Sequence, residues 1–186
     1  SIKNKIQFIS TPLDLESADF LIKHIDIIKI ASGDNNFFPL IEKLVKSNKK
    51  VIISTGMADL KNIIEVDKFV KKKIGKSLCR KNISYLHCVS SYPVNDKDAN
   101  LKSISLLIKK FKNSIGYSDH TLGNEACLAA VALGAKIIEK HFTLNKNFSK
   151  FRDHALSADF KDLRQLVKSI RKIENQLGTE RKIVLP

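Results

Sequence analysis

The feature that most constrains the fold is a regular alternation of short apolar runs with longer segments whose apolar residues recur at helical spacing. Leu40, Ile41, Leu44 and Val45, for example, share one face of a helix. Alternation with short connections predicts a parallel sheet covered by helices. The predicted strands are residues 5–9, 26–31, 50–53, 83–89, 116–121 and 137–142. The predicted helices are residues 17–23, 39–47, 60–73, 104–111, 124–133 and 158–177, with Gly178 as the last C-cap.

The carboxyl ends of these strands are polar in almost every unit, finishing in Ser, Thr, Asp or His. In an open doubly wound sheet, only strands near the switch point carry such residues. In a (β/α)8 barrel, every strand directs its carboxyl end at one mouth. The pattern therefore favours an α/β fold of the TIM-barrel type. A full barrel takes about 250 residues, so we expect an incomplete barrel of six β/α units, with an open sheet as the alternative.

Two of the predicted strands end in a histidine, in the segments Gly-Tyr-Ser-Asp-His-Thr (116–121) and Ile-Ile-Glu-Lys-His-Phe (137–142). The side-chain period of two places Ser118 and His120 on one face of the first strand. Glu139 and His141 share a face of the second. If the strands are neighbours, two imidazoles and a carboxylate converge at their ends. We therefore expect a catalytic metal held by His120 and His141.

The charge of the chain admits three interpretations. Its 33 Lys and Arg outnumber 19 Asp and Glu, which gives a net charge of +14. Such a balance is typical of nucleic-acid binding, but aromatic residues do not alternate with the lysines here. Lysines spread over solvated helix faces are the interpretation we favour. The third is steering of an anionic substrate into a cleft, which needs only a local positive field.

The cysteines and the apolar runs bear on location. Cys79, Cys88 and Cys127 are widely spaced and odd in number, which argues against a disulfide framework and for reduced thiols. No secretory signal is visible, and no apolar run approaches the roughly 20 residues that span a bilayer. We expect a cytoplasmic protein that binds neither membrane nor nucleic acid.

Six strings then establish a specific resemblance. They are Phe8-Ile9-Ser10-Thr11-Pro12, Lys29-Ile30-Ala31-Ser32-Gly33-Asp34, Ser54-Thr55-Gly56-Met57, His87-Cys88-Val89-Ser90-Ser91-Tyr92-Pro93, Gly116-Tyr117-Ser118-Asp119-His120-Thr121 and Glu139-Lys140-His141-Phe142. In this order they resemble the sialic acid synthases, which include N-acetylneuraminate, legionaminate and pseudaminate synthases. The resemblance covers essentially the whole chain. It implies barrel strands three to eight, with residues 1–186 as one partial barrel domain and the family's carboxyl-terminal antifreeze-like domain absent.

The resemblance also implies a reaction. Phosphoenolpyruvate condenses with the open-chain aldehyde of an N-acylated hexose, releasing phosphate and forming a nonulosonic acid. The implied cofactor is a divalent metal, Mn²⁺ with Mg²⁺ as the alternative, held by His120 and His141 and polarising the aldehyde oxygen. Glu139 is expected to bind water or a substrate hydroxyl beside it. The implied partners are these small molecules, together with a second copy in a homodimer or a complementing segment.

Motif matching assigns further residues to the substrates. Contacts with phosphoenolpyruvate are implied at Thr11, Lys29, Ser32, Ser90 and Ser118. Contacts near the sugar are implied at Asp34, Ser54, Tyr92 and Asp153, although capping and packing explain Ser54 and Tyr92 equally well. Asp34 and Ser90 stand where some members carry glutamate and asparagine.

Lys29 also draws attention without the resemblance, because it interrupts the apolar run Ile27-Ile28-Lys29-Ile30. A lysine in a buried strand is costly unless an anion or a carboxylate meets it. The alternative is a lysine on an edge strand that reaches water.

The chain departs from the family in lacking the residues of its first two strands. These include a glutamate that is a candidate base, an asparagine–histidine pair, and the lysine and glutamine of a Lys-Phe-Gln motif. We therefore expect the isolated chain to be inactive. One alternative is a non-catalytic fragment or assembly module completed by a partner chain, since exposed strand edges seek partners. Another is a related condensing enzyme such as a KDO-phosphate synthase, which the two histidine motifs disfavour.

Overall fold

The computed structural model describes residues 2–149, 151–182 and 184. Its centre is one parallel sheet of five strands in sequential order. The strands are β1 (Ile27–Ile30), β2 (Lys50–Ser54), β3 (Ile83–Cys88), β4 (Ser114–Asp119) and β5 (Ile138–Lys140). All neighbours pair in parallel, so all the carboxyl ends lie at one edge of the sheet.

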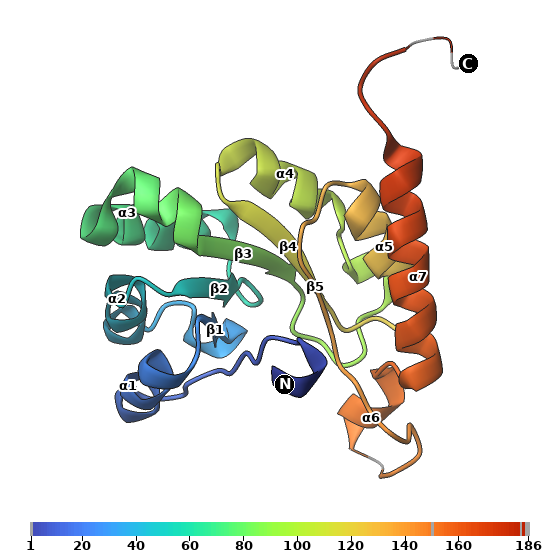
Figure 1. Cartoon of the computed structure of the whole chain (residues 1–186), viewed down its shortest axis with the longest axis horizontal. Helices are drawn as coiled ribbons and strands as arrows, with labels where there is room; N and C mark the ends of the chain where they lie inside the picture. The colour runs from blue at the N-terminus through green and yellow to red at the C-terminus, as the bar shows by residue number, and fades with distance from the viewer. Residues whose placement is uncertain (1, 150, 183, 185–186) are drawn as a thin grey trace.

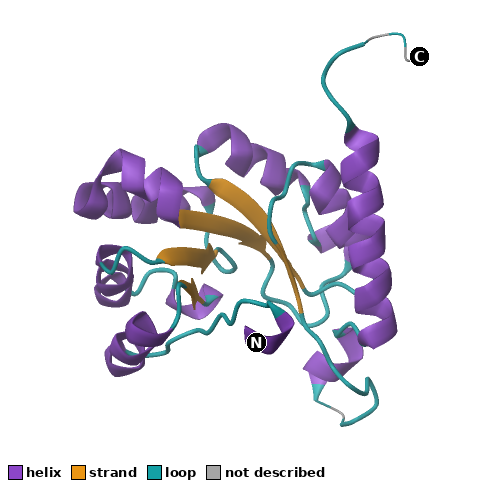
Figure 2. Ribbon diagram, viewed as in Figure 1, coloured by secondary structure: helices purple, strands orange, loops and turns teal. Residues whose placement is uncertain are grey.

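Helices connect the strands and lie in an arc outside them, as Figures 1 and 2 show. The helices cover one face of the sheet, and the opposite face lies on the inner side of its curl. They are α1 (Leu15–His24), α2 (Phe38–Lys46), α3 (Leu60–Asn82), α4 (Lys102–Lys110), α5 (Glu125–Ala132), α6 (Arg152–Leu156) and α7 (Phe160–Leu177). Short 3₁₀ turns occupy Ile2–Asn4, Ser32–Asp34 and Asp96–Asp98.

The hydrophobic core lies between the sheet and the arc of helices. Alternate strand residues such as Ile28, Ile30 and Tyr85 are fully buried on this side. They meet the apolar stripes of the helices, including Leu40 and Leu44 of α2. The residues between them on each strand, Lys29 for example, therefore face the opposite, concave side.

The sheet is strongly curled. β1 and β5 are its outermost strands, and four steps of about 4.8 Å would separate them by on the order of 19 Å in a flat sheet. Yet Lys29 Nζ of β1 lies 3.0 Å from Glu139 Oε1 of β5. The outer strands thus turn toward each other across the concave side. The prediction of a TIM-type fold is confirmed as a curled half-barrel.

The strand predicted at residues 5–9 is wrong, so the half-barrel has five strands rather than six. In its place a single bridge joins Ser10 to Ile28, with the amide of Lys29 donating to the Ser10 carbonyl at 2.9 Å. Ile6 and Phe8 are 66% and 60% exposed. The apolar side chains of this segment find no packed surface in the described residues, so nothing draws it into the ladder.

The helices differ from prediction in two places. α3 continues past residue 73 to Asn82, with a break at Gly75 (φ 80°, ψ 161°). The short helix α6 was not predicted. Gly178 is confirmed as the cap of α7, at φ 57°.

Three further expectations concern the cysteines, the membrane and the end of the chain. All three cysteines are buried and unbridged, as predicted. None of the helices described is both long and apolar enough to cross a membrane. Pro186, the last residue of the predicted partial barrel domain, lies outside the described residues.

Candidate active site

Both candidate metal ligands lie one residue beyond the ends of neighbouring strands, His120 after β4 and His141 after β5. Their ring centroids are 5.2 Å apart, with the planes at 70°. Nδ1 of His120 lies 2.9 Å from the carbonyl oxygen of Val89. A proton on that nitrogen completes the hydrogen bond and leaves Nε2 with a free lone pair, which suits a metal ligand.

The two histidines differ in their titration. Burial lowers the pKa of His141, and the charge of His120 lowers it further. Burial also acts to lower the pKa of His120, but contacts with Cys88 and the Val89 carbonyl outweigh burial and raise it. The neutral form, which a metal requires, is therefore favoured at His141.

Tyr92 lies against this pair. Its ring centroid is 4.2 Å from that of His120 and 5.8 Å from that of His141. The loop after β3 thus brings an aromatic side chain onto both imidazoles. Tyr92, predicted near the sugar, is placed at the histidine pair.

An ion pair spans the concave face below the histidines. Lys29 lies 3.0 Å from Glu139 Oε1, and the hydroxyl of Ser118 donates to the same oxygen at 2.6 Å. Lys29 is therefore on the concave side rather than facing the helices, and Glu139 is the carboxylate that meets it. The side chains of Lys29 and Glu139 retain 20% and 34% exposure, so both can be reached from outside.

Three loops meet at Gly56. Its amide donates to Ser32 Oγ at 3.1 Å. A β-carbon added at Gly56 would lie 2.7 Å from Ser32 Oγ and 2.3 Å from Ser90 Oγ. Only glycine fits here without a shift, and two serines predicted to contact phosphoenolpyruvate are brought together. Hydroxyl and amide donors of this kind suit an anion.

Ser54, the last residue of β2, is 1% exposed, and its hydroxyl has no hydrogen-bond partner in the described part of the chain. An unpartnered buried hydroxyl is uncommon. Because Ser54 is buried, this hydroxyl is not exposed to a ligand in the structure.

The remaining predicted residues lie at the margins of the site. Thr11 follows the Ser10 bridge and is half-buried. Asp34 ends the 3₁₀ turn after β1 and is half-buried. Asp153 is the second residue of α6, and its charge acts to raise the pKa of His141.

The donor set fits a metal only in part. Among residues 2–149, 151–182 and 184, no three His, Cys, Asp or Glu side chains converge as a metal-binding group. Glu139 is engaged by Lys29 and Ser118 instead of completing a triad with the histidines. Two imidazoles, one with its Nδ1 already bonded, fit a metal that keeps most of its positions for water and substrate.

Two features of the site were not identified from the sequence. Cys88 Sγ lies 3.9 Å from His120 Nδ1; burial acts to raise its pKa, but contacts with His120 and Ser32 lower it overall. Asp119 and Lys140, neighbours of the two histidines in sequence, form a buried ion pair at 2.6 Å. The alternation of side chains along the two strands was a usable signal for the second feature, since both residues fall on the face opposite Ser118 and Glu139.

Comparison with known proteins supports this interpretation of the chain. The NeuB family model matches residues 1–182. An N,N'-diacetyllegionaminic acid synthase of Campylobacter jejuni is 46% identical over 177 residues, covering 95% of this chain and 52% of the relative. An uncharacterised protein of Methanocaldococcus jannaschii is 50% identical over 182 residues, covering 97% and 52%. The chain thus spans about half the length of the curated relatives it matches.

A solved structure matches the fold closely. The crystal structure of N-acetylneuraminic acid (sialic acid) synthetase from Leptospira borgpetersenii, in complex with citrate, superposes with a TM-score of 0.91 at 39% identity. The match covers 100% of this chain and 63% of that one.

Proposed function

This chain belongs to the NeuB family, and we propose that it carries the phosphoenolpyruvate-binding and metal-binding side of a nonulosonic acid synthase. The observation that supports this best is the grouping at one strand edge of the His120–His141 pair with Lys29, Glu139 and Ser118. Relatives named as legionaminic acid and N-acetylneuraminate-9-phosphate synthases support the reaction class. The substrates would be phosphoenolpyruvate and an N-acylated hexose in its aldehyde form.

In this proposal the cationic and hydroxyl groups hold phosphoenolpyruvate. Lys29 supplies the charge, and Ser32, Ser90, Ser118 and Thr11 supply donors around the concave face. The hydroxyls of Ser32 and Ser90 both lie close to Gly56, so an anionic group beside them would meet donors from two loops. These residues would bind and orient phosphoenolpyruvate, and the proposal assigns them no catalytic step.

The aldehyde would lie beside the histidines, next to Tyr92. Bound Mn²⁺ or Mg²⁺ supplies Lewis-acid polarisation of the carbonyl oxygen. His120 and His141 would hold it, Glu139 would accept a hydrogen bond from a substrate hydroxyl or water, and Asp34, Ser54, Tyr92 and Asp153 would line the sugar. Tyr92 over both rings would also limit the access of water.

Manganese binding tests the first element of the proposal. In calorimetric titration of the chain, His120→Ala and His141→Ala should each weaken Mn²⁺ binding by about tenfold or more, since a ligand is lost. His24→Ala is the matched control, because His24 is exposed at the end of α1. Affinity unchanged in both ligand variants would remove the metal site from the proposal.

A further inference from the structure

The pairing of β4 with β5 ends just before the two candidate ligands. Asp119 and Lys140 are the last residues in register. Beyond them the main chains turn to different neighbours: the His120 carbonyl accepts from Val94 and the His141 carbonyl from Ala158. The backbone pairing of β4 with β5 therefore does not fix the spacing of the two imidazoles.

The side chain of Lys140 spans this gap. Its ammonium lies 2.6 Å from Asp119 Oδ2 and donates to the carbonyl oxygen of Thr121 at 3.0 Å. Asp119 and Thr121 are the residues on either side of His120, while Lys140 directly precedes His141. The Lys140 ammonium thus connects the strand that carries His141 to the residues on both sides of His120.

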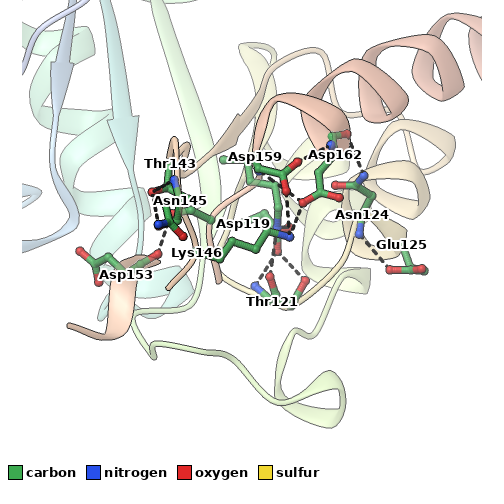
Figure 3. A network of polar contacts seen from close by, with 12 residues as sticks. Asp119, Thr121, Asn124, Glu125, Thr143, Asn145, Lys146, Asp153, Asp159 and Asp162 are labelled. Carbon is green, nitrogen blue, oxygen red and sulfur yellow. Dashed lines mark hydrogen bonds and ion pairs between the residues drawn. The ribbon is translucent and has the colours of Figure 1, made fainter. Parts of the chain in front are cut away.

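Asp119 is itself held rigidly. Its Oδ1 accepts from the Tyr117 hydroxyl at 3.0 Å and from the amide and hydroxyl of Thr121 at 2.9 and 2.8 Å. The Cys127 thiol of α5 lies 3.2 Å from Oδ2. Figure 3 shows Asp119 and Thr121 joined in this way, together with the neighbouring cluster of Lys146, Asp159 and Asp162. A carboxylate with this many donors has one orientation.

Burying the Asp119–Lys140 ion pair has a desolvation cost, so a gain in stability does not explain why the pair is present. The side chains of Lys140 and Asp119 are 3% and 0% exposed. Burying two charges seldom gains stability over apolar residues of the same size, and the best-attested use of such pairs is to fix geometry. The donors on Asp119 outweigh its burial and lower its pKa, so it is held as a carboxylate.

We propose that Asp119 and Lys140 are positioning residues that set the spacing and orientation of the His120 and His141 imidazoles. In this proposal they act through the strand ends that carry the ligands, because their buried side chains lie on the face opposite Ser118 and Glu139. The expected effect of these residues on metal affinity rests on the proposed function, whereas their effect on the spacing of the two imidazole rings does not.

The test uses the metal-free chain. Ring protons of His120 and His141 should give a mutual nuclear Overhauser contact, since their centroids are 5.2 Å apart. Lys140→Met and Asp119→Asn should abolish or strongly weaken this contact. Lys71→Met is the matched control: it breaks the 2.6 Å pair of Lys71 with the buried Asp67 within α3 and should leave the contact intact. Mn²⁺ affinity should fall about 10- to 100-fold in the first two variants only.

The double variant Asp119→Asn/Lys140→Met guards against misfolding. It removes both charges, so no buried charge is left without its partner. It should recover thermal stability relative to the single variants without recovering the ring contact. A wild-type ring contact in folded Lys140→Met, or in the double variant, would overturn the inference. Unchanged Mn²⁺ affinity in both His120→Ala and His141→Ala would count against the proposed function alone, because the ring contact is measured without metal.

Discussion

Lys29 is the residue whose placement could be argued most fully from sequence, and the structure puts it where that argument required. A lysine inside an apolar run had to meet an anion or reach water, and it meets Glu139 on the concave face while keeping 20% exposure. What sequence could not supply was the identity of that partner, since Glu139 lies 110 residues away on the opposite edge strand.

Lys29→Met should weaken phosphoenolpyruvate binding by about 10- to 100-fold, because a hydrogen bond to a charged group contributes roughly 1.5–3 kcal/mol. The fold should persist, since Glu139 remains partly exposed and is not left as a buried charge. Calorimetric titration with phosphoenolpyruvate measures the loss. Lys23→Met, an exposed lysine of α1, should bind normally; equal affinity in both variants would contradict the assignment.

Ser54 gives a prediction about the stability of the fold. Ser54→Ala removes a hydroxyl that has no described partner, so the free energy of unfolding should stay the same or rise by up to about 1 kcal/mol. The neighbouring Thr55→Val breaks a 2.8 Å hydrogen bond to the Leu86 carbonyl and should cost about 1 kcal/mol. Urea denaturation compares the two, and an equal loss in both would show that Ser54 has a partner.

The helices and strands that have a clear apolar periodicity were predicted from the sequence. Those that depend on local backbone geometry or on a packing surface were not. The strands β1 to β5 and the helices α1 to α5 and α7 follow from their apolar spacing. The segment 5–9 has strand-like composition, yet composition does not provide a surface on which Ile6 and Phe8 can pack. The continuation of α3 beyond Gly75 was missed because a glycine after a lysine run indicates a helix end.

The break in α3 makes a prediction at this scale. Gly75 has φ 80° and ψ 161°, a region essentially confined to glycine, and the space that a β-carbon would occupy there is open. Gly75→Ala should therefore cost about 1–3 kcal/mol of unfolding free energy through backbone strain alone. Gly33→Ala also meets open space but lacks a positive φ, and should have little effect. Chemical denaturation of both variants measures the difference.

For the molecule as a whole, the barrel type followed from the polar strand ends, because a shared mouth is the simplest arrangement that uses all of them. The degree of curl did not follow, since it depends on twist accumulated over five strands and on contacts between residues far apart in sequence. The positions of His120 and His141 were predictable from strand alternation. The Asp119–Lys140 pair beneath them required the register of β4 against β5.

We expect the isolated chain to show no ordinary turnover. The mouth is lined by five described strands, and the chain matches about half the length of its relatives. Groups that act together in catalysis lose far more than additively when some are absent. With phosphoenolpyruvate, Mn²⁺ and a series of N-acylated hexoses, phosphate release should stay well below about 1 per second. A rate at or above that value would show that these residues suffice.

The ion pair across the concave face has a consequence for how an anion would enter. Lys29 is not an idle positive charge: in the resting molecule its counter-ion is Glu139, held in place by Ser118. An incoming phosphate or carboxylate would have to exchange with that placeholder or share the lysine with it at the cost of repulsion. Arrival of the anion at Lys29 would then leave Glu139 with the Ser118 hydroxyl as a partner. Binding of an anion at Lys29 would thus change the charge around Glu139 and, through it, around His141.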